Sequence, residues 1–215
     1  IIEHQLKPGD KLPTITELSR ELGVSVSKVR EELEVVRTMG LVQVKPRIGS
    51  QVQEFDFAPT ATLSVLYALG QDRTHFQDIA TLRKHIELSF WHRAVQQLTE
   101  NDITELRDLV ARAYGKLNHT PIEVPFQEHR SLHMTFFKHL ANPFVQGLLS
   151  AYWAAYRAFG VALYAGLSYH REVWTYHERM VECVAQGEFE EGRRALREHM
   201  RSEERRVGKE CATGC

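Results

Sequence analysis

LPTITELSRELGVSVSKVREELEVVRTMGLVQVKPRIGSQV, residues 12–52, is the stretch of sequence that decides the fold. Its pattern predicts two capped helices joined at Gly23, followed by two short strands with a basic turn between them. This order of elements is typical of a winged helix-turn-helix, in which the second helix enters the major groove of duplex DNA. The sequence therefore predicts double-stranded DNA as a partner.

Local signals support both helices. Thr14 and Glu17 have the spacing of a capping box, so a first helix is expected to begin there and to run to about Leu22. Ser25 is placed to cap the second helix, which Gly40 ends. Apolar residues at helical spacing are expected to face a shared core: Leu18, Leu22, Val29, Leu33 and Val36.

Polar residues on the other faces are the candidate DNA contacts. Residues 41–44 alternate into a strand, the chain turns at 46–49, and a second strand returns over 50–53. Basic side chains gather on the second helix and near the tip of this hairpin. The predicted DNA-binding residues are Thr16, Ser25, Ser27, Lys28, Arg30, Lys45 and Arg47.

A plain protein-protein module is the alternative interpretation of this domain. Residues 1–55 hold eight Lys and Arg against eight Asp and Glu, so the segment has no strongly basic footprint. The acids Glu31, Glu32 and Glu34 nevertheless lie farther along the second helix than the basic residues near its start. This separation favours DNA binding, with modest affinity for each monomer.

The strings PGDKLP, ELSRELGVS, VREEL and GLV resemble the DNA-binding domain of the GntR family of bacterial regulators over Leu6 to Val52. The resemblance implies arginine contacts with DNA at three positions. Arg30 keeps the last of them, while Thr16 and Val26 occupy the other two. Neither replacement can grip a guanine edge with two hydrogen bonds as arginine does, so we expect an operator that differs from the common family sequence.

Composition predicts a two-domain protein of the cytoplasm. The chain has 215 residues, 43% of them apolar, and a net charge of -1. An apolar stretch at 147–167 contains Arg157 and recurring aromatic residues, so we expect a buried helix there and no membrane partner. No signal peptide opens the sequence, and the cysteine spacing fits neither a zinc ribbon nor a disulfide framework: Cys183, Cys211 and Cys215.

The expected fold class is mainly α, with an N-terminal winged helix-turn-helix, its small β-hairpin wing, and a C-terminal all-helical bundle. The predicted divisions are a DNA-binding domain at 1–55, a linker with a short helix at 56–74 and the bundle at 75–200. Start and stop signals at Thr99, Asn142-Pro143 and Gly187 help to place its helices. We expect helices at about 62–69, 75–98, 101–117, 122–140, 143–165, 169–186 and 188–200.

The sequences at the two ends of the chain each lead to a prediction. Residues 1–6, IIEHQL, resemble the tail of the first helix of the family domain, so the amino-terminal part is expected to be truncated. Residues 201–211, RSEERRVGKEC, resemble the translation of a sequencing-library adapter, which predicts a non-native tail at 201–215. The alternative is a genuine last helix that continues through RSEERR.

Four histidines of the bundle form the candidate metal site. His129 and His133 are four residues apart, so their side chains project from one face of a helix. His177 and His199 lie 10 residues before and 12 after Gly187, so an antiparallel hairpin would bring them to nearly one level. The sequence contains eleven histidines, and hydrogen-bonded core or surface roles remain the alternative for each one.

A second resemblance covers nearly all the chain from Asp78 onward, to the all-helical FCD effector-binding domain of the FadR-like subgroup. In metal-binding members the first of four ligands is usually aspartate, whereas this chain offers His129, or less favourably Glu128. Four imidazoles suit zinc or nickel and leave the charge of the ion uncompensated, which favours an anionic ligand. The matching strings are Arg83-x-x-x-Glu87, His129-x-x-x-His133, Ala141-Asn142, His177-x-x-Met180, Gly187-Glu188 and Glu198-His199.

The resemblance implies a homodimeric regulator, more often a repressor than an activator, that responds to a small carboxylate effector and binds a palindromic operator. Arg83 matches the family arginine that pairs with the effector, although an ion pair with Glu87 is the alternative. Arg157 is a second candidate, with snorkelling to the surface as its alternative. We expect no enzyme, because His129 is not followed by the glutamate of the zinc-protease helix and no nucleophile motif occurs.

Overall fold

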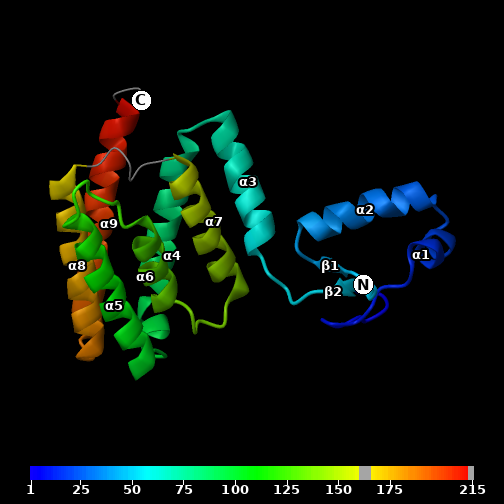
Figure 1. Cartoon of the computed structure of the whole chain (residues 1–215), viewed down its shortest axis with the longest axis horizontal. Helices are drawn as coiled ribbons and strands as arrows, with labels where there is room; N and C mark the ends of the chain where they lie inside the picture. Colours follow the sequence, from blue (N-terminus) through cyan, green and yellow to red (C-terminus); the bar gives the residue numbers. More distant parts are fainter. Residues whose placement is uncertain (160–165, 213–215) are drawn as a thin grey trace.

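The computed structural model describes residues 1–159 and 166–212 and consists of a small winged domain beside a helical bundle (Figure 1). The winged domain contains α1 (Ile15–Leu22), α2 (Val26–Thr38), β1 (Val42–Lys45) and β2 (Gly49–Val52). The remaining elements are α3 (Ala58–Gln71), α4 (His75–Val95), α5 (Glu100–Leu117), α6 (Phe126–Phe136), α7 (Pro143–Phe159), α8 (Leu167–Ala185) and α9 (Phe189–Ala212). The predicted fold class is confirmed.

The two helices of the winged domain begin at the predicted caps. The Thr14 hydroxyl accepts a hydrogen bond from the Glu17 amide at 3.3 Å, and the Glu17 carboxylate accepts one from the Thr14 amide at 2.7 Å. Gly23 ends α1 in the left-handed region, with φ of 65°, and Ser25 caps α2 through the Lys28 amide. These side-chain caps and the left-handed backbone of Gly23 thus fix the sharp turn between α1 and α2.

The wing is an antiparallel hairpin in which Val42 pairs with Val52 and Lys45 with Gly49. Val29 of α2 is buried, as are Val42 and Val52. The predicted inward position of Leu22 is wrong, because its side chain is 62% exposed. The predicted helix tail at 1–6 is also wrong: these residues form a turn closed by bonds such as Leu6 N–H to Ile1 C=O, so no helix from this segment covers Leu22.

The connection to the bundle is shorter than predicted, because α3 begins at Ala58 and includes Pro59. A proline in the first turn of a helix loses no hydrogen bond, so Pro59 starts the helix instead of preceding it. The Phe57 ring packs edge-on against Phe144 of α7 with centroids 5.4 Å apart. A Cβ at Gly147 would lie 2.7 Å from the Cβ of Phe57, so only glycine permits this close approach.

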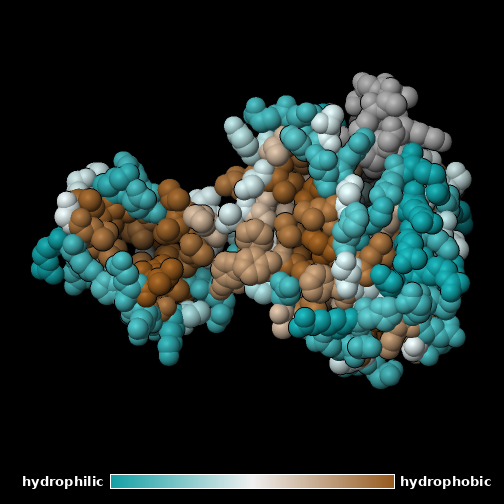
Figure 2. Space-filling view, turned by 180° about the vertical axis from the view of Figure 1, so that it is seen from behind, coloured by the Kyte–Doolittle hydropathy of each residue, from teal (hydrophilic) through white to brown (hydrophobic). Residues whose placement is uncertain are grey.

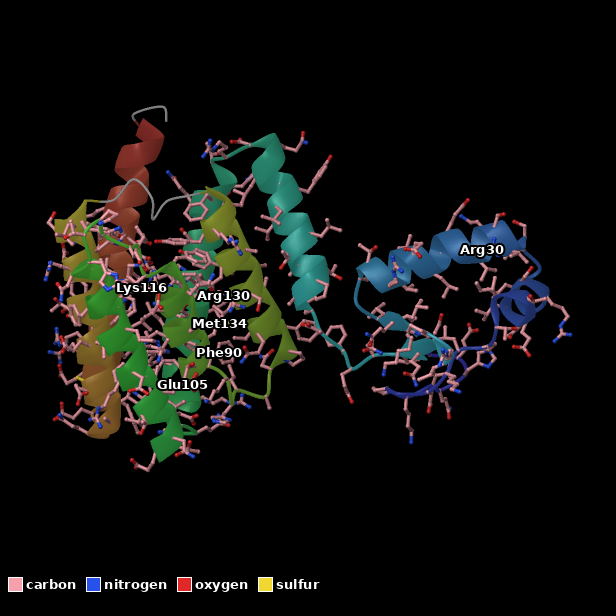
Figure 3. The ribbon with its side chains drawn as sticks, viewed as in Figure 1. Arg30, Phe90, Glu105, Lys116, Arg130 and Met134 are labelled. Atoms are coloured by element: carbon pink, nitrogen blue, oxygen red, sulfur yellow. The ribbon has the colours of Figure 1, made fainter. Side chains whose placement is uncertain are left out.

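The core of the bundle lies where α4, α5, α6, α8 and α9 meet. Helices α8 and α9 form the predicted antiparallel hairpin, and Gly187 between them adopts a φ of 76°. Figure 3 shows the side chains that α5 and α6 direct into the bundle, with Met134 labelled on α6. Its fully buried apolar residues include Trp91, Leu106, Leu132, Phe136, Trp174, Met180 and Leu196.

Besides α3, helices α6 and α9 differ most from their expected boundaries. Helix α6 spans 126–136 instead of 122–140, because Pro125 disfavours helical backbone in the residue before it. Helix α9 does not end at residue 200 but continues to Ala212. The predicted end of the α7 helix at 165 lies outside the described residues. After Val52 the described part of the chain contains no strand, as expected.

Apolar residues gather on the winged domain and on the part of the bundle that faces it (Figure 2). On α3, Leu63 is 57% and Tyr67 is 71% exposed. In the described residues, none of the helices combines the length and the hydropathy that a bilayer crossing requires.

Asp102 caps the start of α5 and joins it to the residues that follow α6. Its carboxylate accepts hydrogen bonds from the Thr99 amide at 2.7 Å and from His139 Nε2 at 2.8 Å, and it pairs with Lys138. Burial alone would raise the pKa of Asp102, but the Lys138 ammonium, the Thr99 amide and hydroxyl, and His139 outweigh it and hold the pKa well below 3.8. The charged carboxylate therefore stabilises the folded state.

We expect Asp102→Ala to lower the free energy of unfolding at pH 7 by about 2 kcal/mol, because a helix cap and a partly buried ion pair are lost together. The folded pKa lies below the unfolded one, so this contribution is complete above the unfolded pKa and declines as the pH falls through it. Urea denaturation at pH 7 and pH 3 measures the difference from the parent, which should shrink at pH 3. Asp108→Ala, an exposed acid on the same helix, is the matched control.

Candidate metal and effector site

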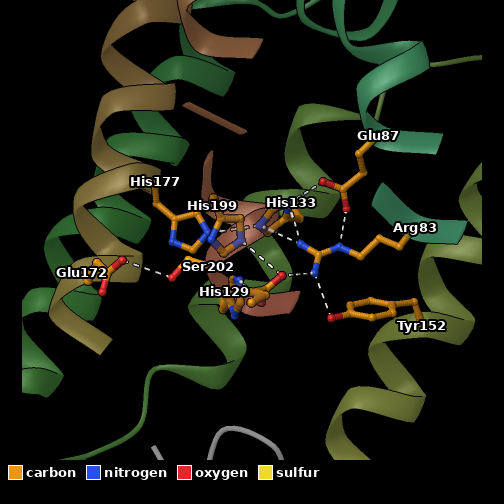
Figure 4. A network of polar contacts seen from close by, with 10 residues as sticks. Arg83, Glu87, His129, His133, Tyr152, Glu172, His177, His199 and Ser202 are labelled. Carbon is orange, nitrogen blue, oxygen red and sulfur yellow. Dashed lines mark hydrogen bonds and ion pairs between the residues drawn. The ribbon is translucent and has the colours of Figure 1, made fainter. Parts of the chain in front are cut away.

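Four histidines converge inside the bundle (Figure 4). His129 and His133 come from α6, His177 from α8 and His199 from α9, and all four side chains are buried. One ring nitrogen of each lies within 4.8 Å of the others, and the Nε2 atoms of His133 and His177 are 3.1 Å apart. Nitrogen atoms at such separations can share one metal ion.

Helix geometry explains the convergence. His129 and His133 stand one turn apart on α6, and their ring centroids are 5.1 Å apart. The α8–α9 hairpin returns His199 to the level of His177, where the two centroids are 4.5 Å apart. Local periodicity and the turn at Gly187 thus form two histidine pairs, and the packing of α6 near the α8–α9 hairpin brings the pairs together.

The electrostatics of the cluster keep the imidazoles neutral. Burial is the largest cause that lowers the pKa of each of the four rings, and the Arg83 guanidinium adds to it. The pKa of His199 falls to about 3. A neutral imidazole has a lone pair to give to a cation, so these rings are in the form that a metal requires.

Several of these nitrogens have no hydrogen-bond partner among the described residues: His129 Nε2, His177 Nδ1 and both ring nitrogens of His199. A buried polar atom without a partner costs free energy, and a cation that binds one nitrogen of each ring would remove part of that cost. The donor set and its unsatisfied atoms therefore fit a divalent ion of the zinc or nickel type.

Glu87 of α4 contacts the histidine cluster through His133. Its Oε2 atom lies 2.8 Å from Nδ1 of His133, and both side chains are fully buried. A carboxylate that binds one ring nitrogen fixes the orientation of a histidine ligand and increases its basicity. The sequence indicated Glu87 only through its spacing from Arg83, and its contact with His133 was not predicted.

Arg83 lies beside both Glu87 and His133, which also contact each other (Figure 4). Its Nε atom donates to Glu87 at 2.6 Å, and its Nη1 atom donates to the Tyr152 hydroxyl at 2.9 Å. Its Nη2 atom lies 3.0 Å from Nε2 of His133. Burial alone would lower the pKa of Arg83, but Glu87, Tyr152 and Glu203 outweigh it and raise this pKa. Arg83 therefore forms the predicted ion pair with Glu87 and also lies beside the histidines.

A cavity of about 240 Å³ opens beside Arg83. The Glu203 carboxylate accepts a hydrogen bond from Arg83 at 2.8 Å and lies 3.8 Å from His129 and 3.5 Å from His199. A carboxylate therefore fits between the arginine and the histidines. The sequence did not indicate Glu203, because it lies in the segment 201–215 that was predicted to be a non-native tail. The cavity is lined by Gln77, Ala80, Thr81, Arg83, Lys84, Tyr152, Tyr156, Tyr169, Met200, Glu203 and Glu204.

Two other candidates lie away from this cavity. Arg157 lines a separate groove of about 700 Å³, together with Arg130 and Trp153, and does not line the cavity beside Arg83. Its role in effector binding stays a prediction. The Glu128 carboxylate, the alternative to His129, pairs with Lys116 at 2.9 Å. Figure 3 labels this lysine and Arg130. That pairing leaves the four histidines as the ligand set among the described residues.

The predicted DNA-binding residues share one domain but not one environment. Arg30 is exposed on α2 (Figure 3), whereas Lys28 pairs with Glu32 at 2.7 Å. The Ser25 hydroxyl caps α2. The remaining four are exposed, on α1, on α2 and on the hairpin: Thr16, Ser27, Lys45 and Arg47.

Comparison with known families matches both parts of the chain. The model described as bacterial regulatory proteins of the gntR family matches residues 1–52, and the FCD domain model matches residues 78–202. The chain is similar in fold to Streptococcus agalactiae GntR, with a TM-score of 0.67, 19% identity, and coverage of 95% of this chain and 93% of that one.

Relatives with similar sequences are transcriptional regulators. The chain is 26% identical to the HTH-type transcriptional regulator LutR of Bacillus subtilis, over 91% of this chain and 90% of that protein. It is also 26% identical to the Uxu operon regulator of Haemophilus influenzae, over 89% of this chain and 71% of the relative. Regulation, and not catalysis, is therefore the activity of its relatives, as the sequence predicted. The chain belongs to the GntR family of bacterial transcriptional regulators, and its second domain is an FCD domain.

Proposed function

We propose that this regulator is a homodimeric, ligand-responsive repressor with a metal-assisted pocket for a small carboxylate effector. One observation carries the proposal: four buried, neutral imidazoles with unsatisfied nitrogens lie beside a buried arginine that already binds a carboxylate. An ion bound by neutral ligands keeps its double positive charge, which attracts an anion to an open coordination position.

Within this site each residue has a distinct task. His129, His133, His177 and His199 would hold the ion, and zinc or nickel suits their nitrogen atoms. Arg83 would bind the effector carboxylate, because its guanidinium is fixed by Glu87 and reaches the same space as the histidines. When bound, the ion supplies positive charge next to that carboxylate.

The winged domain would read the operator as a pair. A palindromic site requires two copies related by a two-fold axis, each placing α2 in one major groove. Arg30, Lys28 and the hairpin tip are the candidate contacts, and the exposed apolar residues of α3 offer surface to a second copy. Effector binding would change the freedom or the spacing of the two winged domains, and about 1.4 kcal/mol of coupling is enough for a tenfold change in DNA affinity.

A metal-independent regulator is the second candidate. It is favoured by the contacts of His133, whose Nε2 atom lies 3.0 Å from Nη2 of Arg83 and 3.1 Å from Nε2 of His177, because these contacts give the ring a structural role without a cation. The histidines would then be pocket residues, and an organic ligand alone would change DNA affinity.

Elemental analysis of the purified protein, together with a genomic-fragment binding screen at stated salt, separates these candidates. We expect one divalent ion for each chain, and operator affinity that changes at least tenfold when a small carboxylate is added. Metal-free, folded protein that still responds to the carboxylate would establish the second candidate. Operator binding that no carboxylate changes would contradict both.

A further inference from the structure

A second groove, of about 700 Å³, lies on the bundle between α3, α6 and α7. It shares none of its described lining residues with the cavity beside Arg83. Two arginines line it: Arg130 of α6, which is half-buried and labelled in Figure 3, and Arg157 of α7, which is exposed. The other lining residues are Thr62, Phe126, Gln127, Ser150, Trp153, Ala154 and Ala158.

The groove carries positive charge that no acid in its lining offsets. None of the described residues that line it is Asp or Glu, and neither α3 nor α7 contains an acid. The one acid of α6, Glu128, is buried and already pairs with Lys116 at 2.9 Å. A cleft lined by one sign of charge raises the local concentration of ions of the opposite sign. The groove therefore suits an anion.

Two guanidinium groups in one groove favour a doubly charged anion. Each guanidinium presents a planar fork of donors that matches the oxygen atoms of a phosphate. A phosphate ester with one organic substituent carries about 1.5 to 2 negative charges at pH 7 and has three acceptor oxygens. A carboxylate carries a single charge on two oxygens and would neutralise the pair only in part. A phosphate is therefore the better match to this groove.

Beside the arginines, the groove combines aromatic rings with hydroxyl and amide groups. The Phe126 ring is half-buried and packs edge-on against Trp153, with centroids 6.4 Å apart. The indole Nε1 of Trp153 has no hydrogen-bond partner in the part of the chain that the structure describes. Thr62, Gln127 and Ser150 add further polar groups. Apolar walls with a few polar groups are typical of small-molecule sites, and this set matches a ring that carries hydroxyl groups.

We propose that this groove binds a small phosphate monoester of a hydroxylated ring, either a sugar phosphate or a nucleoside monophosphate. Arg130 and Arg157 together bind the phosphate, and Phe126 and Trp153 contact the ring. The groove is a second site, so this inference goes beyond the proposed function and does not depend on it.

Trp153 also contacts the histidine cluster, so it provides a spectroscopic signal. Its ring centroid lies 4.8 Å from that of His129 and 4.8 Å from Cζ of Arg83, while the same side chain lines the groove. The side chain is almost fully buried, so a ligand that packs against it changes the surroundings of the indole. Binding in the groove should change the tryptophan fluorescence of the parent, and Trp153→Phe should remove most of that change.

Calorimetric titration of the full chain with ribose 5-phosphate, AMP and inorganic phosphate, and with ribose and adenosine, tests the inference. We expect ribose 5-phosphate or AMP to bind at least about tenfold more tightly than inorganic phosphate, and their order to identify the preferred ring. Ribose and adenosine should show no binding, because they lack the anionic group.

Arg130→Gln and Arg157→Gln should each weaken binding of the better monoester about tenfold, because one of two guanidinium contacts is lost. The matched control is Arg112→Gln, which removes an exposed arginine of α5 outside the groove and should leave the affinity unchanged. Circular dichroism checks that each variant is folded.

The titration is repeated after a chelator has removed any metal, because phosphate oxygens also bind divalent ions. The affinity should stay the same. Binding that is lost with the metal but kept in both arginine variants would place the phosphate at the histidine cluster and overturn the inference. Inorganic phosphate that binds as tightly as both monoesters would also overturn it. So would a lack of phosphate binding, and a changed oligomeric state of the arginine variants would then identify the groove as an interface between copies.

Discussion

Purified His177→Ala protein is expected to contain no stoichiometric divalent ion, whereas the parent contains one for each chain. His177 supplies one of the four candidate ligands found among the described residues, and its Nε2 atom lies 3.1 Å from that of His133. Loss of an outer partner of a metal ligand weakens binding by about 10–100-fold, and loss of a ligand itself should cost at least as much. Competition with a chromophoric chelator measures the change in affinity.

The control for this result is His119→Ala. His119 is an exposed histidine that pairs with Glu123, so its removal changes the histidine count without touching the cluster. A Glu87→Gln variant adds a graded test, because it keeps all four ligands and changes the carboxylate that contacts both His133 and Arg83. Unchanged metal content in folded His177→Ala protein, checked by circular dichroism, would exclude the four-histidine site.

Arg30→Ala is expected to reduce operator affinity at least tenfold in the dimer. Arg30 is exposed on α2, unlike Lys28, whose ammonium is paired with Glu32. An arginine that contacts a base edge or a phosphate contributes about 1–3 kcal/mol, and a dimer loses this contact twice. Fluorescence anisotropy with labelled operator at several salt concentrations measures both the affinity and the salt slope.

Arg112→Ala supplies the comparison for that experiment, since Arg112 is exposed on α5 in the helical domain and its loss removes the same charge. It should leave operator affinity within twofold of the parent. If both variants weaken binding equally, the effect comes from net charge, and α2 does not present Arg30 to DNA.

The elements that depend on neighbouring residues were predictable from the sequence. Thr14 and Ser25 cap their helices at the expected positions because a cap needs only the next three residues. One helical turn on α6 and one hairpin at Gly187 predicted the two histidine pairs, and the cluster contains both of them. Helical periodicity and the stop signal at Gly187 therefore predicted most of the candidate site.

The errors have a different physical origin. The contact between Glu87 and His133 joins residues 46 positions apart, and no local pattern encodes such a distance. Leu22 has the spacing of a core residue, but burial also requires a covering element, and residues 1–6 form a turn instead of a helix. The helix expected at about 62–69 begins earlier, at Ala58, because the first turn of a helix tolerates Pro59.

Helix α7 belongs to the ligand cavity and to the domain junction at the same time. Tyr152 contacts Arg83, while Phe144, eight residues earlier, receives the rings of Phe55 and Phe57 from the connection to the winged domain. Eight residues of helix span about 12 Å, and a helix of this kind moves as a rod. Because Gly147 has no side chain, the connection at Phe57 packs directly against α7. A tilt of α7 when the cavity fills would therefore move the connection to the DNA-binding domain, and no other element would be needed to transmit the movement.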